Sequence, residues 1–287
     1  MGLISFLVAV VSRLYRTQIR HQVLVISKLM LMTIGFSFSS GGLHAQSIEL
    51  SIHFDEVTSP ALSAQREAII DSAIADGVEE VLQDELELEQ DLSLRFVSEA
   101  EPDKYLVFDE EKSEIRLAYQ MRAAIIDRLS RKHPELKASS LQKQADAVLE
   151  MALYHQLAHA LSSNFGLSEI GQETALNQLA VLLLLEGHEA ETRINITALK
   201  RFGLIAIDYD SDGDDYWKSH GLNFELFSKG ICIIVGSAPD RYELAADRVG
   251  FNDNKIDNCV DDYGLALANW LDNLYDYLKK GGNFIRL

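Results

Sequence analysis

A long helical segment with two histidines on its apolar side constrains this chain more than any other feature. The pattern begins at Ser139 or Ser140, either of which can cap a helix N-terminus, and ends before Gly166, which suits a left-handed C-cap. His155 and His159 stand four residues apart, so both imidazoles leave the same face of the helix. Apolar neighbours put that face on or beside the core: Leu153, Leu157, Ala158 and Leu161.

The pentapeptide His155-Gln156-Leu157-Ala158-His159 has the layout of the zinc peptidase motif His-Glu-x-x-His. Two imidazoles at this spacing can hold a zinc ion. Gln156 occupies the position of the general base, but it is a neutral amide without a carboxylate to accept a proton. Metal binding and catalysis are therefore separate questions. The spacing alone is weak evidence, because two helix histidines can also be exposed or satisfied in the core.

The next helix offers a third metal ligand. Glu173 follows His159 by fourteen residues, across the turn at Gly166, and a glutamate from a following helix completes a His₂Glu zinc site in thermolysin-like enzymes. Asn177, one turn later, stands where such sites place a carboxylate behind a ligand histidine. Each residue has an alternative explanation. An acidic side chain is favoured in any first helical turn, and Asn177 could be an ordinary surface amide.

The remaining pattern predicts an α+β fold that is mostly helical, with a small antiparallel sheet packed on a zincin-like helical core. Short alternating or apolar runs predict strands, two of them forming a hairpin around 109–113. Longer patterns predict helices. The strands are expected at 47–54, 92–97, 105–108 and 115–119, and the helices at 61–90, 120–131, 139–164, 171–185, 222–236, 240–249 and 256–278.

Residues 1–46 differ from the rest of the chain. They carry four basic residues and no acidic one, followed by an apolar stretch and small residues before Ala45. This composition predicts a signal peptide, and therefore an exported protein with one domain at 47–287. An uncleaved membrane anchor and a start nearer Met30 or Met32 are the alternatives. No later segment reaches the roughly 18 consecutive apolar residues of a membrane span.

The net charge is −18, and removing the basic leader makes it more negative still. This charge argues against nucleic acids and anionic membrane surfaces as partners, because both require basic patches. Only Cys232 and Cys259 are available for a disulfide, which an oxidising compartment would favour over two buried free thiols. The alternating acids of Asp210–Asp215 suggest calcium, but Leu222 stands where the loop needs a glutamate. A solvated acidic turn is the preferred interpretation.

Together these motifs resemble an uncharacterised bacterial family described as putative zinc metallopeptidase, a domain of unknown function. The resemblance covers about Leu92 to Leu274. The motifs that carry it, in chain order, are Leu117-Ala118-Tyr119-Gln120, His155-Gln156-Leu157-Ala158-His159-Ala160, the stretch from Gly171-Gln172-Glu173 to Asn177-Gln178-Leu179-Ala180, His220, Cys232-Ile233-Ile234-Val235-Gly236, Cys259-Val260-Asp261-Asp262-Tyr263 and Trp270.

The resemblance implies a zinc site at His155, His159 and Glu173, with Asn177 behind it. The departures from the family pattern share a direction: an amide replaces a carboxylate at Gln156, Asn177 and Gln120. We therefore expect an exported member of the family whose peptidase activity is weak or absent. The alternatives are an envelope protein that binds a peptide or protein partner through the former cleft, and a helical protein without metal.

Overall fold

Four strands form one mixed sheet in the computed structural model, which describes residues 48–98, 100–101, 104–167, 173–187, 194–208 and 224–280. The strands are β1 (Leu50–Phe54), β2 (Leu92–Val97), β3 (Leu106–Asp109) and β4 (Glu114–Ala118), and the spatial order is β1-β2-β4-β3. Leu92, Leu94 and Phe96 of β2 are buried and alternate with more exposed residues, as expected for a half-buried strand.

The predicted α+β class, mostly helical, is confirmed, but the expectation of an antiparallel sheet is wrong for two of the three strand pairs. β1 pairs with β2 and β2 with β4 in parallel, while only the β3–β4 hairpin is antiparallel. The reason lies in the connection between β1 and β2. Two helices, α2 (Pro60–Asp71) and α3 (Ile74–Asp84), return the chain to the same end of the sheet, and such a crossover produces a parallel pair.

The segment predicted as one helix from 61 to 90 is broken between α2 and α3. Ala73 separates them with a left-handed backbone, at φ +56°. The break turns the amphipathic α3 so that Ile74, Val78 and Val81 enter the core. A left-handed alanine gives no sequence signal, because this conformation is normally taken by glycine or asparagine.

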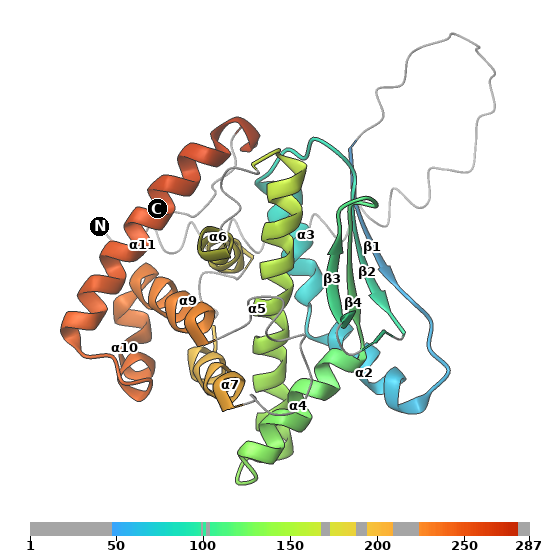
Figure 1. Cartoon of the computed structure of the whole chain (residues 1–287), viewed down its shortest axis with the longest axis horizontal. Helices are drawn as coiled ribbons and strands as arrows, with labels where there is room; N and C mark the ends of the chain where they lie inside the picture. Colours follow the sequence, from blue (N-terminus) through green and yellow to red (C-terminus); the bar gives the residue numbers. More distant parts are fainter. Residues whose placement is uncertain are drawn as a thin grey trace, which may run out of the picture. The chain divides into compact units, whose positions relative to one another are not determined.

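Helices make up the rest of the described chain. They are α4 (Gln120–Lys132), α5 (Ala138–Asn164), α6 (Glu173–Glu186), α7 (Ile196–Asp208), α9 (Phe224–Ser237), α10 (Pro239–Arg248), α11 (Asp253–Leu274) and the 3₁₀ turn η3 (Tyr275–Tyr277). Helix α7 was not predicted from the sequence. Figure 1 shows α5 between the sheet on one side and α6, α7 and α9 on the other. Accordingly, α5 contacts β3, β4, α6 and α7, and its apolar residues are buried around most of the helix.

The two ends of α5 compare differently with the sequence prediction. Its C-terminus is confirmed, since Gly166 has φ +62° and the N–H of Leu167 donates to the Ser162 carbonyl oxygen at 2.8 Å. Its N-terminus lies slightly earlier than predicted. Lys137 occupies the N-cap position with extended backbone, and no side chain caps the helix there. Helix α5 is therefore stabilised by the burial of its side chains and not by an N-cap.

Helices α9 and α11 are joined by the disulfide Cys232–Cys259, which confirms the predicted pair. The two Cα atoms are 4.9 Å apart, within the normal range for a disulfide. None of the helices in the described part of the chain is both long and apolar enough to cross a bilayer. The predicted leader (1–46), the acidic loop Asp210–Asp215 and His220 lie outside the described residues.

Candidate metal centre

His155 and His159 project from the C-terminal half of α5 toward one point. Their Nε2 atoms are 3.2 Å apart, and the two rings meet edge to face. His155 is fully buried, whereas 31% of the His159 side chain is exposed. The helical repeat brings the rings together, and burial of the surrounding α5 residues holds them in place. His155 is therefore enclosed by the core, and His159 reaches solvent.

Glu173 approaches the histidine pair from the first turn of α6. Its Oε2 lies 3.6 Å from His155 Nε2, and its Oε1 lies 3.6 Å from His159 Nε2. The side chain is 56% exposed, so the carboxylate reaches the pair from the solvent side. One ligand atom from each of the three residues falls within 4.8 Å of the others. The structure therefore brings together all three residues that the sequence suggested as ligands.

The donor spacing can be compared with the geometry that zinc requires. Ligand atoms about 2.0–2.1 Å from a tetrahedral ion lie roughly 3.3–3.4 Å from one another. The two nitrogens are 3.2 Å apart, and each nitrogen lies 3.6 Å from a different oxygen of Glu173, so these distances are close to that edge length. A single Glu173 oxygen and both nitrogens fall within 4.8 Å of one another, so binding a metal requires only a small movement of the carboxylate. Two imidazole nitrogens and a carboxylate oxygen are also a common ligand set for zinc. The three side chains therefore fit the metal in chemistry, and their spacing is close to what it requires.

Gln156 does not behave as a free side chain beside this site. Only 4% of the residue is exposed, and its Oε1 accepts the backbone N–H of Phe108 at 3.1 Å. Because β3 is an edge strand, Gln156 supplies an acceptor that a further strand would otherwise supply. The side chain therefore connects α5 to the sheet. Its acceptor oxygen is engaged, and an amide has no basic site for a proton at neutral pH.

Asn177 lies one helical turn after Glu173 on α6, as the sequence suggested. Its Oδ1 is buried and has no hydrogen-bond partner among the described residues. Burying an amide oxygen without a hydrogen bond is unfavourable. This oxygen can therefore still accept a hydrogen bond beside the site. Whether Asn177 orients a ligand histidine stays a prediction.

One polar contact near the site could not be foreseen from the sequence. Ser163, one turn after His159 on α5, donates its hydroxyl to Glu110 Oε1 at 3.1 Å. Glu110 belongs to the turn between β3 and β4 and is exposed. The hairpin thus brings a carboxylate to the turn of α5 that follows His159. No local pattern signals this, because 53 residues separate the two partners.

Comparison with known proteins identifies a family. The sequence profile of a family described as putative metallopeptidase matches residues 54–274. This range includes every strand of the sheet apart from most of β1, the three donor residues and both cysteines. No curated protein and no solved structure matches the chain.

Proposed function

The chain belongs to this family of putative metallopeptidases, and from that membership we propose that it binds one zinc ion through His155, His159 and Glu173 while its peptide hydrolysis is weak or absent. The spacing of the three donors carries the proposal. A zinc ion held there would supply Lewis acidity toward a peptide carbonyl group. The remaining requirement is a group that accepts a proton.

Gln156 supports the second half of the proposal. A general base must have a lone pair that a proton can occupy near neutral pH, and a carboxamide oxygen does not meet this requirement. Its hydrogen bond to Phe108 also holds the side chain toward the sheet edge. Loss of a general base typically lowers the rate by about 10²–10⁴-fold. Residual hydrolysis in this protein is therefore expected to be slow.

Export is part of the same proposal. It is supported by the basic and apolar composition of residues 1–46 and by the Cys232–Cys259 disulfide, because disulfides persist mainly in oxidising compartments. N-terminal sequencing of protein recovered from the cell envelope or medium tests it, with a new terminus expected after Ala45. Recovery only from the cytoplasm would contradict export.

Metal analysis of the purified protein tests zinc binding. After dialysis against zinc and removal of the excess, we expect about one zinc per chain, lost in His155→Ala. His53→Ala is the matched control, since His53 is exposed on β1 and is not among the three donors. Absence of zinc from the wild-type protein, or its retention in His155→Ala, would refute the assigned ligands.

Restoring the carboxylate tests the catalytic half. We expect Gln156→Glu to cleave peptides faster than the wild type. One carboxylate oxygen can accept the hydrogen bond from the Phe108 N–H, and the other can accept a proton from the attacking water. The double variant Gln156→Glu/His155→Ala should lose the gained activity if it depends on the metal. Zinc-dependent cleavage by the wild type at a rate equal to Gln156→Glu would show that Gln156 is not the cause of weak activity.

A further inference from the structure

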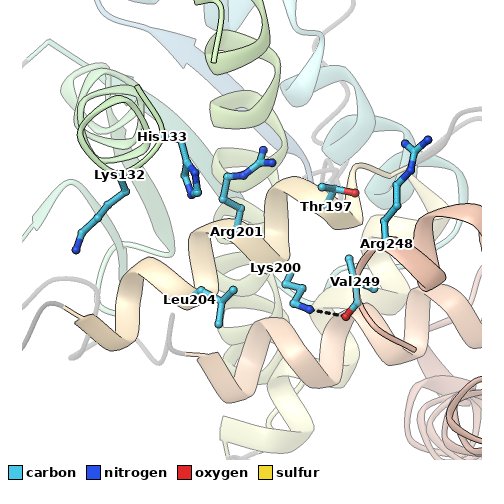
Figure 2. Close-up of a pocket in the computed structure, with 8 residues that line it drawn as sticks. All are labelled: Lys132, His133, Thr197, Lys200, Arg201, Leu204, Arg248 and Val249. Carbon is cyan, nitrogen blue, oxygen red and sulfur yellow. Dashed lines mark hydrogen bonds between the residues drawn. The ribbon is translucent and has the colours of Figure 1, made fainter. Parts of the chain in front are cut away.

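A pocket on another part of the molecule gathers positive charge in an acidic protein. It has a volume of about 370 Å³ and lies between the end of α4, the middle of α7 and the end of α10 (Figure 2). Its cationic lining consists of Lys132, Lys200, Arg201 and Arg248, together with His133, and none of the described residues that line it is acidic. The whole chain has 44 acidic and 26 basic residues, so this clustering opposes the composition.

Two of these cations are held in place by neutral partners. Lys200 donates from Nζ to the carbonyl oxygen of Val249, and Arg201 donates from Nη1 to Gln144 Oε1. An ammonium group has three N–H donors and a guanidinium has five, so each keeps donors for a ligand. Neither of these contacts neutralises the charge. Side chains that are already positioned also lose less conformational entropy when a ligand binds.

Helix termini explain only part of the cluster. Lys132 and Arg248 are the last residues of α4 and α10, where a cation stabilises the negative end of the helix dipole. Lys200 and Arg201 lie in the interior of α7, so their own helix end does not account for them. In Figure 2 the imidazole of His133 faces the Arg201 side chain. Two interior cations and the cations of two helix ends thus line the same pocket, and this charge favours an anion.

A second pocket continues from the first. Its volume is about 310 Å³, and it shares Lys200 and Val249 with the cationic pocket. Three apolar side chains dominate its remaining lining: Phe227, Ile231 and Phe251. Phe227 and Ile231 are almost fully buried in the core, so they form a fixed apolar wall. Charge and apolar surface therefore meet at Lys200.

We propose that the joined pockets bind a small amphipathic anion. Its carboxylate or phosphate group lies among Lys200, Arg201 and Arg248, and its apolar chain lies along Phe251, above the buried Phe227 and Ile231. Pockets of this size suit a single small molecule, with apolar walls and a few polar groups that fix its orientation. This site uses none of the residues of the candidate metal centre.

One acidic side chain, Glu135, contacts a lining residue of the cationic pocket and competes with such a ligand. Glu135 Oε1 lies 3.2 Å from His133 Nδ1. The pKa of Glu135 is lowered by a hydrogen bond from its own backbone and, more weakly, by His133 and Arg201. Its negative charge therefore interacts favourably with the same cations. Removing that charge should therefore strengthen binding of an external anion. A misfolded variant would bind the anion more weakly, so tighter binding cannot result from misfolding.

Calorimetric titration of the full chain with octyl phosphate, octanoate and inorganic phosphate tests the proposal. Octyl phosphate is expected to bind with one molecule per chain, at least tenfold tighter than inorganic phosphate, because its chain buries apolar surface. Octanoate distinguishes a carboxylate from a phosphate as the preferred head group. Binding should weaken as salt is added, since ionic attraction is screened. No saturable binding of either octyl compound at millimolar concentration would overturn the proposal.

Paired variants separate the head-group and chain contacts. Arg248→Gln should weaken all three ligands about tenfold, whereas Arg241→Gln, at an exposed position elsewhere on α10, should leave them unchanged. Phe251→Ala should weaken only the octyl compounds, and Glu135→Gln should tighten all three several-fold. Equal losses in Arg248→Gln and Arg241→Gln would indicate unspecific attraction. Sedimentation with anionic phospholipid vesicles but no binding of free octyl compounds would replace the small molecule with a membrane surface.

Discussion

At the scale of single residues, the Tyr154 side chain of α5 packs against two glycines, Gly77 of α3 and Gly187 after α6. Its side chain is fully buried, and its Oη has no hydrogen-bond partner among the described residues. A Cβ added at Gly187 would lie 1.9 Å from Oη, and one at Gly77 would lie 2.9 Å from it. Both positions therefore require glycine for space. Burial also raises the pKa of Tyr154 well above 10.0, with the charges of Glu150, Glu80 and Glu186 adding to the shift.

Tyr154→Phe is expected to keep or slightly raise stability, by about 0–1 kcal/mol, because the lost hydroxyl makes no hydrogen bond. The variant also changes the response to alkali. A tyrosine whose pKa is raised in the folded state ionises first in the unfolded chain, so unfolding becomes easier as pH rises above about 10. Urea denaturation at pH 7 and pH 10.5 should show a smaller alkaline loss in the variant. A loss above 1 kcal/mol at pH 7 would contradict the assigned lack of a partner.

At the scale of elements, the contact between α9 and α11 depends on one glycine beside the disulfide. A Cβ at Gly236 would lie 1.9 Å from the carbonyl oxygen of Cys259, which is backbone and cannot move alone. We expect Gly236→Ala to lower the free energy of unfolding by about 3 kcal/mol through overpacking. Gly264→Ala on α11 is the matched control, because nothing lies within 4 Å of its added Cβ. It should raise stability by about 0.5–1 kcal/mol, since alanine favours helix.

Chemical denaturation of both variants in oxidising buffer measures the contrast. Equal stability changes would mean that α9 and α11 can separate without cost, which would contradict a close backbone contact. The disulfide should still form in Gly236→Ala, because its Cα separation of 4.9 Å can widen and stay within the range that a disulfide tolerates.

Most elements were predictable from the sequence, whereas their contacts were not. Period-two alternation located β2 at its observed bounds, and Gly166 marked the end of α5. The parallel pairing of β1 with β2 depends on a crossover whose path is a tertiary property. The same holds at the site. The spacing of His155 and His159 follows from the helix itself, but the Gln156 bond to Phe108 joins residues 48 apart. The cationic pocket draws on three separate helices, so no local pattern signals it.

At the scale of the whole molecule, α5 connects the sheet to the helical layer on its other side. Gln156 bonds it to β3, and Glu173 of α6 reaches its two histidines. A metal ion at that position would add a second connection between α5 and α6, which already pack together. Binding a ligand to the folded state alone stabilises it by mass action. The proposed zinc site should therefore be visible in the unfolding of the entire domain.

Thermal denaturation with and without zinc measures this effect. At a free zinc concentration about 100 times the Kd, the folded state gains about 2.7 kcal/mol. For a domain of this size that gain corresponds to a rise in Tm of roughly 5–10 °C. A chelator should reverse it, and magnesium should not reproduce it, because magnesium prefers oxygen ligands. His155→Ala should unfold at the same temperature with or without zinc, whereas Gln156→Ala, which keeps all three donors, should retain the shift. An equal zinc effect in the wild type and His155→Ala would place the metal elsewhere in the chain.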